Sequence, residues 1–283
     1  MSKVVKRLLT FFIGIPLVLA VVFCDFLNHL PLQIAIGVFA VLGANEFYNM
    51  LTKKGCVLFN KELLLILTAL LPFSSYIFLL AGLSLDVTPW LFIALIILLM
   101  GFECFSAKSF ENSVYKIAYS ALTLFYTGLL LTFLSRMTIL PDSKYIISLF
   151  LIFVFMCDSF AWFFGILFGK STRGFFKASP NKSLVGFFGG IITAIACGIL
   201  FKFIFPTVFF GSIWKIVLVS FTTALAAIIG DLIESVFKRS FGVKDSGTII
   251  PGRGGLLDCL DSLILGAPIY YIGIHFLYLI AKS

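Results

Sequence analysis

The chain has 283 residues, of which 61% are hydrophobic and only 12% are charged. A water-soluble domain of this size carries charge on about a quarter of its residues, so the composition excludes one and predicts that lipid forms part of the solvent. The net charge of +8 comes from basic residues scattered among apolar segments, which excludes the continuous basic patch of a nucleic-acid-binding protein. Anionic lipid head groups and phosphate-bearing substrates are the expected partners.

The first predicted element is an apolar run near residues 8–27, preceded by Lys3, Lys6 and Arg7. No small-residue cleavage site follows it, so we interpret it as a retained first membrane span and not as a signal peptide. The eight further runs that approach the length of a spanning helix lie near residues 31–51, 62–82, 88–107, 115–138, 145–169, 184–206, 213–237 and 257–281. The predicted fold class is therefore an all-α, polytopic integral membrane protein with about nine transmembrane helices.

The basic residues predict the orientation of these spans. If the N-terminus is cytoplasmic, sixteen of the 21 Lys and Arg residues lie on the inner side. A miscounted span would invert every later loop and remove this bias, so the asymmetry supports both the count and the orientation. We expect one membrane domain, with an N-terminal half (1–140), a C-terminal half (141–283) that carries the catalytic motifs, and an outward C-terminus.

The six cysteines predict neither a metal site nor a disulfide framework. No two of them form a C-x-x-C pair, and most lie in apolar runs. We expect free thiols that act as small apolar side chains. Lone cysteines and compact loops suit a bacterial inner (plasma) membrane, with the active site facing the cytoplasm.

Two predicted inner loops are longer, more polar and more basic than the others. The first, 170–183, carries Lys170, Lys177 and Lys182 around Ser179-Pro180-Asn181. The second, 238–256, combines four basic residues with five glycines. Glycine lets backbone N–H groups approach a ligand, and Lys and Arg supply the countercharge that phosphates need. Ordinary positive-inside charge in the first loop and a flexible connector in the second remain alternatives.

Five acidic residues fall near the predicted inner ends of the last four spans: Asp158, Asp231, Glu234, Asp258 and Asp261. An ionisable group in a span costs several kcal/mol unless it is paired or faces a polar cavity. Carboxylates that converge at one depth repel one another unless a cation lies between them, and oxygen ligands suit Mg²⁺. Alternatives are a buried salt-bridge network with the basic loops, and an ion-conducting or transport pathway.

Spacing within these segments adds two expectations. Asp231 and Glu234 share a helical face, as do Asp258 and Asp261, and Glu234 precedes Lys238 by four residues, the spacing of a structural ion pair. The other ionisable residues in the spans are weaker candidates for a functional role. Glu46 and Glu103 lie near inner helix ends, from which they could simply reach the interface, and both histidines lie near the outer face.

The stretch from Ser235 to Asp261 resembles the signature of phosphatidate cytidylyltransferases, also called CDP-diacylglycerol synthases. The matching positions are Ser235, Lys238-Arg239, Lys244-Asp245, Gly247, Ile250-Pro251, Gly254-Gly255-Leu256, Asp258 and Asp261. Upstream, Asp158-Ser159-Phe160-Ala161 and Ser179-Pro180-Asn181-Lys182-Ser183 are similar to further motifs of the family, and Glu46-Phe47-Tyr48 is a fainter echo. Two positions depart, because the family usually has His at the position of Arg253 and Arg at that of Cys259. Arg253 can bind phosphate but cannot readily exchange a proton near neutral pH, which argues against a proton-transfer role there.

The resemblance implies an enzyme that joins CTP to phosphatidate and releases pyrophosphate. It implies that Asp231 and Asp258 hold Mg²⁺, with Asp261 as a further ligand or a neighbour of one, and that a second cation such as K⁺ is used. Phosphate-steadying residues would be Lys238, Arg239, Lys244 and Arg253; nucleotide-binding residues would be Ser179, Asn181, Lys182 and Ser235; Asp245 would be a ligand or would orient Lys244. A homodimer is implied by the resemblance alone.

Two rival functions remain at the level of sequence. Another membrane CTP-dependent lipid or polyprenol phosphotransferase would use similar residues, although the D-G-x-x-A-R pattern of CDP-alcohol phosphotransferases is absent. An ion-coupled transporter would distribute polar groups through the depth of the membrane, often with inverted repeats. Here the acidic residues cluster toward one predicted face and no repeat is visible.

Overall fold

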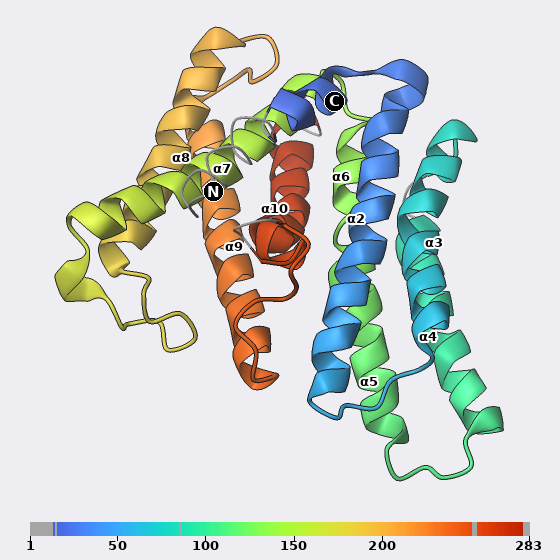
Figure 1. The fold of residues 1–283 in the computed structure, drawn as a ribbon. Helices are drawn as coiled ribbons and strands as arrows, with labels where there is room; N and C mark the ends of the chain where they lie inside the picture. Colours follow the sequence, from blue (N-terminus) through green and yellow to red (C-terminus); the bar gives the residue numbers. More distant parts are fainter. Residues whose placement is uncertain (1–13, 15, 85–86, 251–253, 280–283) are drawn as a thin grey trace. The chain divides into compact units, whose positions relative to one another are not determined.

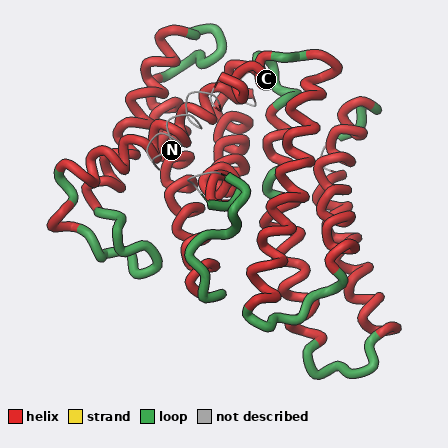
Figure 2. Tube along the Cα trace, in the orientation of Figure 1, coloured by secondary structure: helices red, strands yellow, loops and turns green. Residues whose placement is uncertain are grey.

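The computed structural model describes residues 14, 16–84, 87–250 and 254–279, and every regular element in these ranges is helical (Figures 1 and 2). The described part contains no β-strand, only two isolated bridges in loops. Within these described ranges, eight helical segments are long and apolar enough to cross a membrane. The predicted all-α polytopic membrane fold is confirmed.

The helices follow the predicted spans closely. In chain order they are α2 (Phe26–Lys53), α3 (Lys61–Leu80), α4 (Val87–Ser106), α5 (Ser113–Thr123), η1 (Leu124–Leu129), α6 (Thr132–Met137), α7 (Ser143–Leu167), η2 (Lys170–Thr172), α8 (Leu184–Ile204), α9 (Ile213–Ser240), α10 (Leu257–Ile274) and η3 (His275–Leu279). The three segments α5, η1 and α6 form one span, as do α10 and the start of η3. Residues 8–13 and 15 of the first predicted span, 8–27, lie outside the described residues, whereas residues 16–23 are helical. This span stays a prediction.

The start of α2 is interrupted where a loop was expected. Leu27, Asn28 and His29 have left-handed backbone angles inside the segment assigned to this helix. Non-glycine residues adopt these angles only at a cost, which is typical of a turn. The turn falls at the junction of the first two predicted spans, 8–27 and 31–51, and the regular part of α2 begins after it.

The model separates the chain into two compact units, described in turn. The first comprises residues 1–139 and 240–259, and the second comprises 140–239 and 260–283. The change of unit after Ile139 falls beside the predicted boundary at 140, but the glycine-rich segment 240–259 groups with the N-terminal half. Whether these units behave as the single membrane domain expected above stays a prediction.

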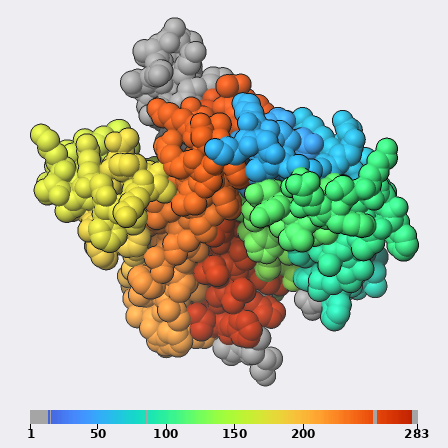
Figure 3. Space-filling model, turned by 90° about the horizontal axis from the view of Figure 1, so that it is seen from below, coloured from blue at the N-terminus to red at the C-terminus, as the bar shows by residue number. Residues whose placement is uncertain are grey.

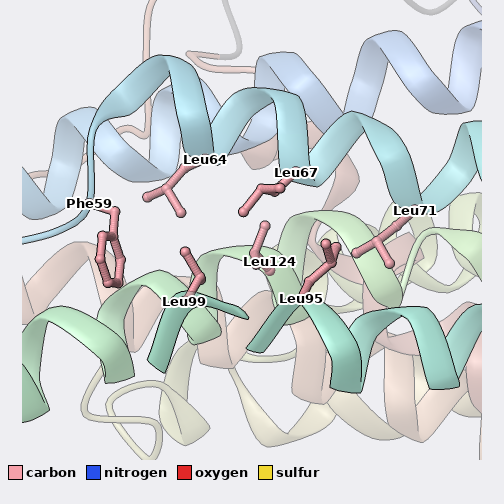
Figure 4. Close-up of a cluster of buried hydrophobic side chains, with 7 residues drawn as sticks. All are labelled: Phe59, Leu64, Leu67, Leu71, Leu95, Leu99 and Leu124. Atoms are coloured by element: carbon pink, nitrogen blue, oxygen red, sulfur yellow. The ribbon is translucent and has the colours of Figure 1, made fainter. Parts of the chain in front are cut away.

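The first unit is built on apolar packing among α2, α3, α4 and the span that contains η1. Figure 4 shows a buried cluster from α3, α4, η1 and the loop before α3, formed by Phe59, Leu64, Leu67, Leu71, Leu95, Leu99 and Leu124. The helix α3 begins at Asn60, whose side-chain oxygen accepts from the N–H groups of Glu62 and Leu63. An N-cap of this kind satisfies donors that the first turn leaves without helical partners.

In the second unit, α7 and α8 pack closely because α8 carries glycines at the contact. A Cβ atom at Gly190 would lie 2.8 Å from the carbonyl oxygen of Cys157 on α7. Small residues let helix backbones approach in this way inside membranes. Ser183 starts α8 by accepting a hydrogen bond from the N–H of Gly186 at 3.0 Å. Because Ser183 directly follows Lys182, this cap also sets where the first basic loop ends.

Candidate active site

In the second unit, the basic loop 170–183 contacts α9 through an ion pair and a hydrogen bond. Lys182 forms an ion pair with Asp231, and the Nε of Arg239 donates to the carbonyl oxygen of Ala178 at 3.4 Å. The loop itself is folded back, since the N–H of Gly174 donates to the carbonyl oxygen of Pro180 at 2.9 Å. Figure 3 shows the yellow surface of this region against the orange surface of α9. The predicted nucleotide-binding loop and a predicted metal ligand therefore meet.

Within the second unit, Asp231 and Glu234 of α9 and Asp261 of α10 lie where these two helices cross. A Cβ atom at Gly230 would lie 2.5 Å from the carbonyl oxygen of Asp261, so the backbones are in contact beside Asp231. Asp261 is buried and close enough to Asp231, Glu234 and Asp158 to feel their charge. Neighbouring carboxylates in a poorly hydrated place repel one another, which is the electrostatic condition for attracting a cation.

Lysines already compensate part of this negative charge. Glu234 is buried and forms the predicted ion pair with Lys238, one turn further along α9. That prediction is confirmed, and Lys182 compensates Asp231 in the same way. The salt-bridge network that the sequence left open as an alternative is therefore partly present.

The fit of a metal to these residues depends on how many carboxylates it needs. Among the described residues, no three His, Cys, Asp or Glu side chains are arranged as a metal-binding group. Mg²⁺ needs fewer protein ligands, because it usually keeps several waters and is bound through one or two carboxylates plus substrate phosphates. Asp231 and Asp261, from the crossing helices, suit that smaller donor set.

In the first unit, the glycine-rich loop folds around the side chain of Asp258. Its Oδ2 atom accepts from the N–H of Ser246 at 2.9 Å, from the Ser246 hydroxyl at 2.9 Å and from the N–H of Gly255 at 2.7 Å. Nearby, Ile250 and Gly254 exchange two backbone hydrogen bonds. Asp258 thus holds both arms of a tight hairpin, a role that the sequence did not predict. Its predicted role as a metal ligand stays a prediction.

Glu46 is a second carboxylate in this loop, and the sequence analysis gave it little weight. It lies on α2 and is 3% exposed. Its Oε1 accepts from the N–H of Leu256, and its Oε2 accepts from the N–H of Leu257, each at 2.9 Å. The available signal was a charged residue inside a predicted span, which is costly unless it has partners. These partners lie more than 200 residues away in sequence and so could not be inferred.

Two kinds of similarity to known proteins are found. A family model matches almost the whole chain, and individual relatives match about half to two thirds of it. A model described as the cytidylyltransferase family matches residues 5–277. The chain belongs to the cytidylyltransferase family. The phosphatidate cytidylyltransferase of Staphylococcus epidermidis is 42% identical over 129 residues, 46% of this chain and 48% of the relative. That of Haemophilus influenzae is 38% identical over 156 residues, 54% of each chain.

A third relative, the phosphatidate cytidylyltransferase of Staphylococcus saprophyticus, is 33% identical over 180 residues, 64% of this chain and 66% of the relative. The chain thus spans about half of the length of the first two curated relatives and about two thirds of this third one. Because the family match covers both units, each set of predicted site residues lies within the matched range.

The remaining predicted residues of this cytidylyltransferase-family chain differ in exposure. Ser235 and Lys238 are buried on α9, and Ser179 is half-buried. Three others, Arg239, Lys244 and Asp245, are exposed, as is Asn181. Arg253 lies outside the described residues, and its predicted role stays a prediction. The six cysteines, all of which lie in the described residues, form no disulfide.

Proposed function

We propose that this chain is a CTP:phosphatidate cytidylyltransferase that makes CDP-diacylglycerol and pyrophosphate. The observation that carries the proposal is the ion pair between Lys182 of the basic loop and Asp231 of α9, in a chain of the cytidylyltransferase family. This pair joins a candidate nucleotide-binding loop to the candidate metal-binding helix. The relatives described above are phosphatidate cytidylyltransferases, and the substrates of the proposal follow from theirs.

In the proposed reaction, an oxygen of the phosphatidate phosphate attacks the α-phosphorus of CTP. A new P–O bond forms, the bond between the α-phosphorus and the bridging oxygen breaks, and pyrophosphate leaves in line with its electron pair. The second ionisation of a phosphate monoester lies near pH 6, so the nucleophile needs no separate base at neutral pH. The protein's task is to align two anions and to compensate their charge.

The residues divide according to these tasks. Ser179, Asn181 and Lys182 would bind the nucleotide, because they occupy the turn that is fastened to α9. The side chain of Lys182 is 30% exposed, so a phosphate can reach it while Asp231 keeps it oriented. Ser235, Lys238 and Arg239 follow Asp231 on α9. Lys244 lies in the glycine-rich loop that comes after this helix. These cations would compensate phosphate charge, and Asp245 would orient Lys244.

A divalent metal is generally used in this family, and we propose that it is Mg²⁺. Asp231 and Asp261 would hold it, and when bound it would neutralise phosphate oxygens and the leaving pyrophosphate. Asp258, a K⁺ ion and a homodimer stay predictions from the resemblance. Lys182 would then exchange part of its contact with Asp231 for a contact with phosphate.

The membrane setting suits a lipid substrate. A hollow of about 390 Å³ is lined by Phe164 of α7 and by Leu184, Val185, Phe188, Gly189 and Ile192 of α8. Its lining is almost entirely apolar, which fits an acyl chain and not a nucleotide. Leu184, which lines the hollow, lies two residues after Lys182 in the sequence. A lipid whose acyl chain occupied the hollow would therefore have its head group near the basic loop. We propose that the two basic loops lie on the cytoplasmic side of a bacterial inner membrane.

The test is a radiochemical assay on the purified full chain in detergent, with phosphatidate and labelled CTP. Wild-type protein should form lipid-soluble CDP-diacylglycerol and release pyrophosphate, and chelation of Mg²⁺ should stop both. Release of CDP with a doubly phosphorylated lipid would instead indicate a CTP-dependent lipid kinase. Absence of any reaction with CTP would contradict the proposal.

The Asp258→Asn variant tests the predicted metal ligand in the same assay. Asparagine keeps one carbonyl oxygen for the donors of Ser246 and Gly255, so the hairpin should persist while the negative charge is lost. Turnover should fall below detection. The matched control is Asp142→Asn, at an exposed residue with left-handed backbone angles that asparagine accepts, and it should keep wild-type activity. Normal turnover in Asp258→Asn would remove Asp258 from the metal assignment.

A further inference from the structure

The start of α10 is held by a carboxylate from another helix. The first N–H groups of any helix have no partner within it and are usually capped by a side chain close in sequence. Here the N–H groups of Leu256 and Leu257 both donate to Glu46, on α2. A negative charge at a helix N-terminus is also favoured by the helix dipole. Glu46 therefore fixes where the backbone that carries Asp258 begins its helix.

The same carboxylate contacts the glycine-rich loop at its other arm. The Oγ of Ser246 lies 3.0 Å from the Oε2 of Glu46 and 2.9 Å from the Oδ2 of Asp258. One hydroxyl thus bridges two carboxylates, and because it has a single proton it can donate to only one at a time. Glu46, Ser246 and Asp258 form one connected unit, which we call the loop clamp.

Two glycines of the loop are needed for this close approach. A Cβ atom at Gly247 would collide with the Oε1 of Glu46, and one at Gly255 would lie 2.5 Å from its Oε2. The carboxylate is therefore packed directly on loop backbone, with no room for a side chain between them. Glycines in this loop, interpreted from the sequence as places for phosphate to approach, here also admit a protein carboxylate.

We propose that Glu46 is a positioning residue of the enzyme, acting through the loop clamp. It holds both arms of the glycine-rich loop and thereby orients Asp258 and the loop cations, without contacting substrate. This inference rests on the proposed function. Its physical basis is that the buried Glu46 carboxylate contacts donors on both arms of the loop, the N–H groups of Leu256 and Leu257 on one arm and the shared Ser246 hydroxyl on the other, and so orders both arms.

The test compares Glu46→Gln with Glu103→Gln. Glutamine keeps the size of the side chain but replaces one acceptor oxygen by an NH₂ group, which faces an N–H or O–H donor in the clamp. Glu103 is a matched control because it is also a buried glutamate of the first unit, 4% exposed, but it pairs with Lys116 and Ser113 and not with the loop. Both variants are purified as full chains in detergent.

Two readouts are measured on each variant. In hydrogen exchange followed by mass spectrometry, peptides that contain Leu256 and Leu257 should lose protection in Glu46→Gln alone. In the CTP and phosphatidate assay, Glu46→Gln should raise the Mg²⁺ concentration for half-maximal activity and lower kcat, each by about 10- to 100-fold. Glu103→Gln should stay within about twofold of wild type in both.

The readouts separate this inference from the proposed function. Hydrogen exchange needs no activity, so unchanged protection at Leu256 and Leu257 overturns the positioning role even if the enzyme has another substrate. Equal kinetic losses in both glutamine variants also overturn it, because they would indicate only general loss of structure. If Glu46→Gln does not fold, Glu46→Asp replaces it. That variant keeps the charge but shortens the reach by one methylene, and its losses should lie between wild type and the glutamine values expected above; wild-type exchange and kinetics would refute the role.

Discussion

At the scale of single residues, the acidic side chains inside the spans differ in how far along the chain their partners lie. A charge within hydrocarbon costs several kcal/mol, so each must be compensated. Glu103 and Glu234 pair with Lys116 and Lys238, 13 and four residues away in sequence. The partners of Glu46 and Asp231 lie about 200 and 49 residues away. We infer that the local pairs stabilise a helix end and that each long-range contact joins two distant segments within its own unit.

Lys182→Gln tests the long-range pair of the second unit. Removing the charge takes away a charge-assisted hydrogen bond to a phosphate, so kcat/KM for CTP should fall on the order of 10- to 100-fold. Both side chains of the pair are about 30% exposed, so the free energy of unfolding should change by no more than about 1 kcal/mol. Steady-state kinetics with varied CTP and a thermal melt measure the two effects.

The control for this variant is Lys202→Gln. Lys202 donates to the carbonyl oxygens of Phe209 and Gly211, so it is an equally engaged lysine away from both basic loops. Its replacement should leave kcat/KM for CTP unchanged. An unchanged value in Lys182→Gln as well would exclude Lys182 from nucleotide binding.

At the scale of elements, close helix crossings position the acidic residues. The crossing of α9 and α10 depends on Gly230, which brings the backbone beside Asp231 into contact with the carbonyl oxygen of Asp261. In membranes, where lipid removes most of the hydrophobic drive for helices to associate, this close packing supplies much of the attraction. The position of the candidate metal ligands therefore depends on a residue that has no side chain.

Gly230→Ala is expected to separate this crossing. The new Cβ atom would lie 2.5 Å from the Asp261 carbonyl oxygen, closer than any stable contact, so one helix must shift. Overpacking of this kind costs about 1 to 3 kcal/mol, and the melting temperature in detergent should fall. Gly101→Ala on α4 is the control, because its Cβ would meet no atom within 4 Å. A melting temperature no lower than that of the control would contradict the close crossing.

The helices themselves were largely predictable, and their contacts were not. Runs of about 20 apolar residues have one stable form in lipid, so the predicted run 184–206 became α8 at Leu184–Ile204. The π-helical segment η1 inside the fourth described span leaves no such signal. The loop clamp could not be predicted either. Hydropathy indicates how deep Glu46 lies in the membrane, but it does not identify the backbone N–H groups that donate hydrogen bonds to its carboxylate.

At the scale of the whole molecule, the order of the chain does not match the grouping of its parts. Residues 240–259 follow α9 of the second unit but belong to the compact unit formed by the N-terminal half. The boundary near residue 140 that the sequence predicts simply divides the chain into two halves of similar length. It misses the return of the glycine-rich loop, because the contacts that hold this loop, such as Glu46 with Leu257, join residues at opposite ends of the sequence.

The predicted orientation can be measured with single cysteines in a cysteine-free version of the chain. Lys54 and Lys177 are exposed in predicted inner loops, and Ser84 and Ser212 are exposed in predicted outer loops. In intact bacterial cells, a membrane-impermeant maleimide should label Ser84→Cys and Ser212→Cys. It should label Lys54→Cys and Lys177→Cys only after the cells are made permeable.

This experiment decides more than topology, because sixteen of 21 basic residues follow the predicted inner face. If the inner pair is protected in intact cells, the basic loop 170–183 opens to the side where cells keep CTP, as the proposed reaction requires. Labelling of Lys177→Cys in intact cells would place the loop of Lys182 outside, away from the nucleotide. The charge asymmetry would then have misled both the orientation and the assignment of the substrate, since both rest on the same preference of Lys and Arg for the cytoplasmic side.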